Sequence, residues 1–108
     1  MFMVPGPGPR LQAVQIVEGE PCGYEQITSL SSAASLTIPP NATMALVQAE
    51  TQPVRWRDDA TAPTSSVGMI LYPGNVVQLN TKKQLTNFRA IQTAASAKLN
   101  VVYYEKKV

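Results

Sequence analysis

The chain has 108 residues, with 9 Lys and Arg, 7 Asp and Glu, no His and one Cys, giving a formal net charge of +2. This length supports one domain with its own core. The composition excludes the usual zinc and haem ligand sets, an intrachain disulfide and every catalytic triad that uses imidazole as its base. The small net charge disfavours nucleic acid as a partner. We therefore expect a binding or structural module, not an enzyme, with no catalytic, cofactor-binding or metal-binding residues.

The first ten residues, MFMVPGPGPR, alternate proline with glycine and carry no basic start followed by the apolar run of a signal peptide. Proline fixes φ and removes a backbone donor, so this segment is predicted to be an extended arm outside a domain formed by residues 11–108. An apolar tip favours contact with a neighbouring subunit over a free tail. The arm residues expected to bind a partner are Met1, Phe2, Met3, Val4, Pro5, Pro7, Pro9 and Arg10.

Beyond the arm, apolar and polar residues alternate in short runs separated by turn residues. The turns include residues 18–23, the Pro39–Asn41 and Pro73–Asn75 segments, and a basic turn at 81–84. No run has a helical period. The pattern predicts an all-β antiparallel sandwich, jelly-roll-like. Its predicted strands are residues 11–17, 24–30, 35–38, 43–51, 54–57, 68–72, 76–80, 88–93 and 97–105.

Alternation within these strands assigns each residue to one of two faces. In 54–57, Val54 and Trp56 share a face, and the two arginines share the other. We expect a reduced Cys22 to pack as a small hydrophobic residue, because nothing in the sequence routes the chain to an oxidising compartment. The predicted core is Val14, Ile16, Leu46, Val54, Trp56, Met69, Leu71, Val77, Leu79, Ile91, Leu99, Val101 and Tyr103.

Charge is scarce and unevenly placed, since only 15% of residues are charged, against about 25% in an ordinary soluble domain. Residues 26–49 and 60–81 contain no charge at all. Proline and polar residues interrupt both stretches, so neither resembles a membrane span of about 20 apolar residues, and no membrane partner is expected. One interpretation is a β-protein with Ser and Thr on its surface. The other is a chain largely covered by partners in an assembly.

The densest polar cluster is Arg55, Trp56, Arg57, Asp58 and Asp59. One interpretation is a sugar stacked on Trp56, with its hydroxyls held by the carboxylates. The favoured alternative places Trp56 in the core, because tryptophan is highly buried on average. In that case Arg55, Arg57, Asp58 and Asp59 form ion pairs within or between subunits. Two adjacent carboxylates alone define neither a calcium site nor a hydrolase.

The same cluster carries a resemblance. Arg-Trp-Arg-Asp-Asp at 55–59 is followed by Pro-Thr at 63–64, Gly-Met at 68–69 and Ala-Lys-Leu-Asn-Val-Val-Tyr-Tyr at 97–104. This pattern resembles a family of small virion proteins of tailed bacteriophages, over residues 38–104. The family pattern has glycine where this chain has Ala60, so the turn after Asp59 is expected to differ.

The resemblance implies a structural component of the virion. We expect a capsid decoration (cement) protein on the outer surface of the head, assembled in the host cytoplasm. It would join neighbouring major capsid proteins as a homo-oligomer, a dimer or a trimer. Two alternatives stay open: a tail or head–tail connector component, and a carbohydrate-binding host-adhesion module, which would need an exposed Trp56.

Overall fold

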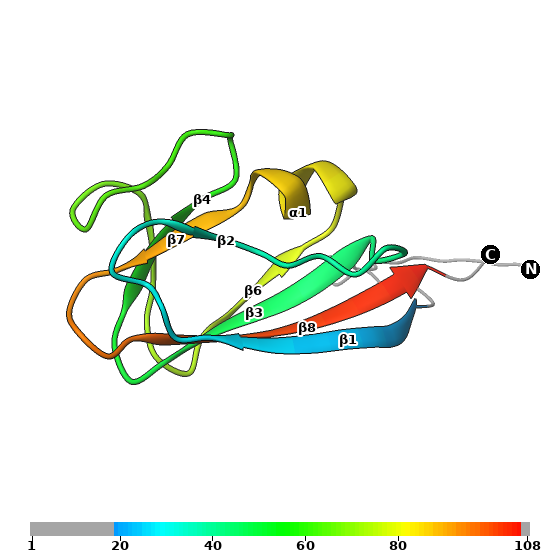
Figure 1. Cartoon of the computed structure of the whole chain (residues 1–108), viewed down its shortest axis with the longest axis horizontal. Helices are drawn as coiled ribbons and strands as arrows, with labels where there is room; N and C mark the ends of the chain where they lie inside the picture. The colour runs from blue at the N-terminus through cyan, green and yellow to red at the C-terminus, as the bar shows by residue number, and fades with distance from the viewer. Residues whose placement is uncertain (1–18, 107–108) are drawn as a thin grey trace, which may run out of the picture.

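The computed structural model describes residues 19–106 as two four-stranded antiparallel sheets that share one core (Figure 1). Sheet A has the strand order β1 (Gly19–Ile27), β8 (Lys98–Lys106), β3 (Met44–Glu50), β6 (Val76–Leu79). Sheet B has the order β2 (Ala34–Ser35), β7 (Arg89–Gln92), β4 (Val54–Arg57), β5 (Met69–Leu71). The prediction of an all-β chain is confirmed, and six of the predicted strands match observed strands to within two residues. The predicted strand at 11–17 lies outside the described residues.

The centre of sheet A explains which residues form the core. β3 and β8 alternate between buried and half-buried positions along their whole pairing. On the buried face, the two alanines of β3 lie opposite larger residues of β8 and its valine lies opposite another valine, so the two strands share the available volume. These buried pairs are Ala45 with Tyr103, Val47 with Val101, and Ala49 with Leu99.

Six predicted core residues are buried and two more pack against the core, so most of that prediction is confirmed. The buried ones are Val54, Leu71, Leu79, Leu99, Val101 and Tyr103, and the partly buried ones are Trp56 and Val77. Three predictions are wrong. Leu46 and Ile91 lie one residue out of phase with the buried face, and Met69 lies on β5, beyond which sheet B has no further strand within residues 19–106. Val14 and Ile16 lie outside the described residues.

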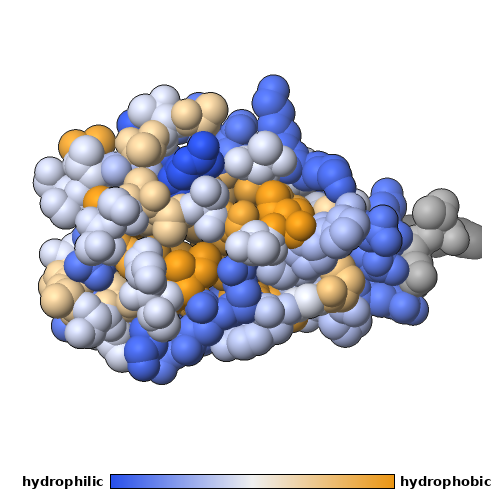
Figure 2. All heavy atoms as spheres, in the orientation of Figure 1, coloured by the Kyte–Doolittle hydropathy of each residue, from blue (hydrophilic) through white to orange (hydrophobic). Residues whose placement is uncertain are grey.

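The connections supply much of the remaining core. Figure 2 shows hydrophobic residues in the middle of the face turned to the viewer, between the two sheets, with hydrophilic residues around them. Sequence alternation could not find the buried residues that lie in loops, in the helix or at strand ends. These buried residues are Leu30, Leu36, Ala42, Leu85, Phe88, Ala90 and Ala97.

A helix stands where a basic turn was predicted, so that prediction is wrong. Helix α1 (Lys82–Asn87) is capped by Thr81, whose hydroxyl accepts a hydrogen bond from the backbone N–H of Gln84 at 3.1 Å. The Gln84 side chain accepts in return from the backbone N–H of Thr81 at 3.2 Å. This capping box satisfies two backbone donors, and Leu85 anchors the helix in the core.

A second correction concerns residues 18–23, predicted as a turn. From Gly19 onward these residues belong to β1, which pairs with β8 as far as Lys106 and has a register shift between Pro21 and Gly23. Proline is tolerated there because β1 is an edge strand and the shift is a bulge. Glycine is required at 23, since a Cβ would lie 2.8 Å from the ring of Pro39. β2 is also shorter than the predicted 35–38 strand.

Candidate functional site

Strand β4 and the loop after it place the polar cluster of residues 55–59. β4 pairs with β7 on one side and β5 on the other, so its alternation fixes where each side chain lies. Val54 is fully buried, and Arg55 lies opposite Ile91 and Ile70 on the other face of the sheet. The predicted division of this strand into two faces is therefore confirmed.

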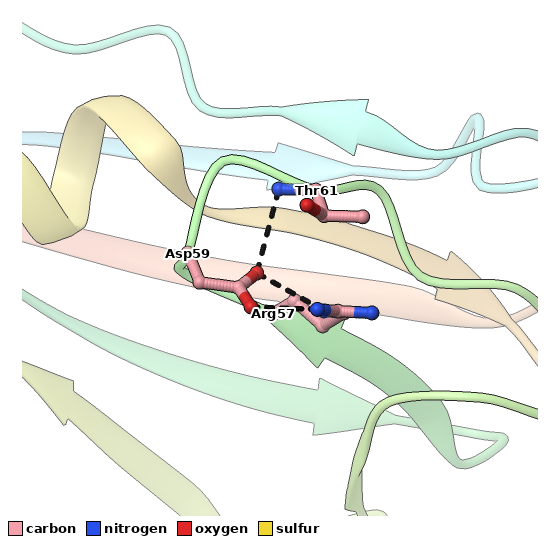
Figure 3. A network of polar contacts seen from close by, with 3 residues as sticks. All are labelled: Arg57, Asp59 and Thr61. Atoms are coloured by element: carbon pink, nitrogen blue, oxygen red, sulfur yellow. Dashed lines mark hydrogen bonds and ion pairs between the residues drawn. The ribbon is translucent and has the colours of Figure 1, made fainter.

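Arg57 and Asp59 form the ion pair of the cluster (Figure 3). The guanidinium donates from Nε to Oδ1 at 3.0 Å and from Nη2 to Oδ2 at 2.6 Å, a two-point geometry that is stronger than a single contact. The backbone N–H of Thr61 also donates to Oδ1, at 3.4 Å. The hydrogen bond from Arg57 lowers the pKa of Asp59, and the same bond raises the pKa of Arg57. An ion pair within the subunit is thus present for these two of the four predicted residues.

The loop turns at Ala60, the position where the resemblance led us to expect a different turn. Ala60 has φ of 72°, in the left-handed region that favours glycine. The backbone therefore keeps the conformation that glycine would adopt, and the alanine bears the strain. The Arg57–Asp59 pair and the Thr61 contact hold the two sides of this turn together.

Asp58 and Arg55 bond to neutral groups among the described residues. The Asp58 carboxylate accepts a hydrogen bond from Nε2 of Gln84 at 3.1 Å, which links the loop to helix α1. Arg55 donates from Nη1 to the carbonyl of Gly68 at 2.9 Å, and its buried Nε has no hydrogen-bond partner there. Their predicted contacts with another subunit remain predictions.

Trp56 belongs to the core side of β4. Its ring stacks on Phe88 with a centroid distance of 5.7 Å and an interplanar angle of 22°, and it packs against the buried cluster. The carbohydrate interpretation expected an exposed Trp56, whereas the ring is partly buried and Phe88 stacks on one of its faces.

A shallow pocket of about 260 Å³ lies beside the cluster, lined by Arg57, Asp58, Asp59, Gly68 and Met69. Its carboxylates are already held by Arg57 and Gln84. Residues 19–106 contain no group of three or more His, Cys, Asp or Glu side chains that could hold a metal ion. Cys22 is a free thiol packed against the core, as expected, and burial raises its pKa, so it is not an activated nucleophile.

The outer face of sheet A carries a second polar cluster, which the sequence analysis missed. Asn100 accepts hydrogen bonds from the Tyr24 hydroxyl at 2.8 Å and from Gln26 at 2.9 Å, and donates to Glu50 at 2.9 Å and Gln48 at 3.3 Å. The side chains come from β1, β3 and β8 and largely satisfy one another. A groove of about 210 Å³ runs beside them.

The exposed apolar side chains concentrate on β5, β6 and their connections, which we call the β5–β6 surface. Exposed fractions are 53% for Val67, 61% for Met69, 37% for Ile70, 54% for Tyr72 and 52% for Val76. All of them lie within the uncharged stretch 60–81. The sequence signal for this surface was that stretch itself, but Met69 had been assigned to the core.

The expected arm residues, Met1 to Arg10, lie outside the described residues. No helix within 19–106 is long and apolar enough to span a membrane. Comparisons of the chain with models of known protein families, with curated proteins and with solved structures found no match.

Proposed function

We propose that the chain is a structural protein of a phage virion, a decoration protein that joins neighbouring major capsid proteins on the outside of the head. In this proposal the two sheets form a jelly-roll-like sandwich and residues 1–10 form an extended arm. Support for the jelly-roll comes from the chain order, because consecutive strands repeatedly change sheets.

The β5–β6 surface is the observation that carries this proposal. Five large apolar side chains are exposed within one stretch of the sequence that contains no charge. Single exposed apolar residues are normal, but several gathered on neighbouring elements suggest a protein interaction site. Edge strands of monomeric proteins usually carry lysine or another charge that discourages pairing, and β5 and β6 carry none. This surface suits a permanent protein partner.

The polar cluster at 55–59 supports a structural role in a different way. Arg57, Asp58 and Asp59 hold the β4–β5 connection and helix α1 in place through bonds to one another and to Gln84. Because these side chains already bond to one another and to Gln84, they are engaged in holding the loop and not in catalysis. They shape the loop beside the β5–β6 surface, which fits a rigid docking element.

Joining several subunits relies on many contacts. A dimer or trimer of this chain that touches several capsid proteins would gain avidity through effective concentration, even where each contact is weak. Within the proposal, the arm adds a further contact. A tail or connector component would use the same surface and differ only in its location on the particle.

The test measures binding to purified phage heads that lack this protein. We expect Tyr72→Lys with Val76→Lys to weaken binding at least about tenfold, equal to about 1.4 kcal/mol, because a charge would have to be desolvated at the interface. Ala95→Lys, an exposed position in the β7–β8 turn, is the matched control and should bind normally. Salt should matter little, since the surface has no charge to screen.

Equal binding by the double variant and the control would remove the β5–β6 surface from the proposal. A cryo-EM difference map between whole phage particles with and without the protein then locates the chain. Density on the tail would replace decoration with the connector alternative, and absence from purified particles would end the virion proposal altogether.

A further inference from the structure

The free edge of sheet B has the properties of a strand-addition site. β5 is the last strand in the order β2-β7-β4-β5, so among the described strands its backbone pairs only with β4. Side chains on this edge are apolar and exposed on both faces of the sheet: Met69 on the face of Leu71, and Ile70 on the other. An added strand would gain main-chain hydrogen bonds and cover apolar groups on both sides.

We propose that this edge accepts residues 11–17 of a second copy of the chain, an inference that rests on the proposed function. The segment LQAVQIV is uncharged and alternates in the way a strand requires, with Val14 and Ile16 on one face and Leu11 and Val17 on the other. Neither segment carries a charge that would oppose the pairing. The contact would make the homo-oligomer that multivalent capsid binding needs.

The position of Gly19 favours a second copy over the chain's own segment. Gly19 pairs with Lys106 at one end of sheet A, and Ile27 pairs with Leu99 at the other. β1 spans about 27 Å between these ends at about 3.4 Å per residue. Residue 17 lies two peptide units from Gly19, hence within about 7 Å of it.

The β5 strand belongs to the far end of the molecule. Pro73, two residues after β5, forms a bridge with Ala49, which itself pairs with Leu99. Because residue 17 is tethered to Gly19 at the opposite end of sheet A, residues 11–17 of the same chain are badly placed to lie along β5. A neighbouring copy has no such constraint.

The pocket beside Met69 gives the incoming strand a place for one side chain. It opens at the start of β5, between Gly68 and the Arg57–Asp59 pair, with a volume of about 260 Å³. An apolar side chain from residues 11–17 would contact Met69 there. Pairing of two β5 strands with each other is the competing arrangement, and the donor variant described next distinguishes the two.

The experiment separates donor from acceptor by complementation in sedimentation velocity. The full chain is expected to associate. Met69→Lys with Ile70→Lys spoils the edge, and Val14→Asp with Ile16→Asp spoils the donor segment, so each variant alone should be monomeric. A mixture of the two should form a heterodimer, because one supplies an intact segment and the other an intact edge. Ala95→Lys should associate like the unmodified chain.

Circular dichroism establishes that each variant is folded. Should either fail to fold, a synthetic peptide of residues 10–18 replaces it and is expected to dissociate the oligomer of the unmodified chain. The proposal is overturned if the donor variant still associates, which would point to β5–β5 pairing. It is also overturned if the mixture stays monomeric, the peptide has no effect, or the unmodified chain is a monomer at about 100 μM, far above the dissociation constant of a specific protein pair. None of these results bears on capsid binding by Tyr72 and Val76.

Discussion

Ala60 bears a conformational strain that one substitution can remove. Its φ of 72° lies where an L-residue with a Cβ is disfavoured. We expect Ala60→Gly to raise the free energy of unfolding by about 0.5–1 kcal/mol, the relief of strain outweighing the extra flexibility of glycine in the unfolded chain. Urea unfolding measures the change. Ala62→Gly, the same chemical change without a left-handed φ to relieve, should lower stability instead, and a loss in both variants would refute the argument.

Tyr103 couples stability to alkaline pH. Its buried hydroxyl donates to the carboxylate of Glu25, which also accepts from the backbone N–H of Thr37 at 2.8 Å. Burial and then the Glu25 hydrogen bond raise the pKa of Tyr103 above its usual value. The unfolded chain therefore loses this proton at about pH 10, while the folded chain retains it. The stabilisation is complete below that pH and declines as the pH rises further.

Tyr103→Phe tests this coupling while keeping the ring. We expect a loss of about 1 kcal/mol at neutral pH from the missing hydrogen bond. Between pH 9 and 11, the stability of the variant should fall less steeply than that of the unmodified chain. Urea midpoints measured across this range would contradict the assignment if the two curves stayed parallel.

At the scale of elements, α1 is a short helix held by its ends. A six-residue helix is marginal by itself, so its capping box and the burial of Leu85 must stabilise it. Thr81→Ala removes the cap and should lower the free energy of unfolding by about 1 kcal/mol. Thr86→Ala is the control on the same helix, because the Thr86 hydroxyl only bonds back to the carbonyl of Lys82 and should matter little. Equal losses in urea unfolding would argue against the cap.

The capping box also shows what the sequence analysis overlooked. Thr81 and Gln84 have the spacing of a capping box, but only Leu85 follows as an apolar anchor, so no helical period was visible. In β3, alternation assigned the residues to two faces correctly, but it did not show which of the two faces is buried. The larger Leu46 suggested the core, yet the smaller Ala45 and Val47 are buried. Their partners on β8 decide this, and pairing between distant strands is invisible in local sequence.

At the scale of the whole molecule, the strand pattern and the turns predicted the all-β architecture. This was possible because each strand and turn has a recognisable pattern in its own residues. The arrangement of 55–59 was only half predictable. Alternation placed Val54 and Trp56 inward. The run of opposite charges predicted ion pairs within or between subunits but did not specify which partners would pair, and the structure pairs Arg57 with Asp59. The bond from Gln84 to Asp58 and the stacking of Phe88 on Trp56 depend on α1 packing beside β4, which no local pattern encodes.

The pairing of Gly19 with Lys106 brings the two ends of the described chain to one pole of the molecule. A short flexible linker between these residues would yield a circular permutant, opened in the exposed Asp59–Ala62 loop. Cargo fused before Gly19 or after Lys106 would leave from that same pole, so the protein could display two passengers side by side.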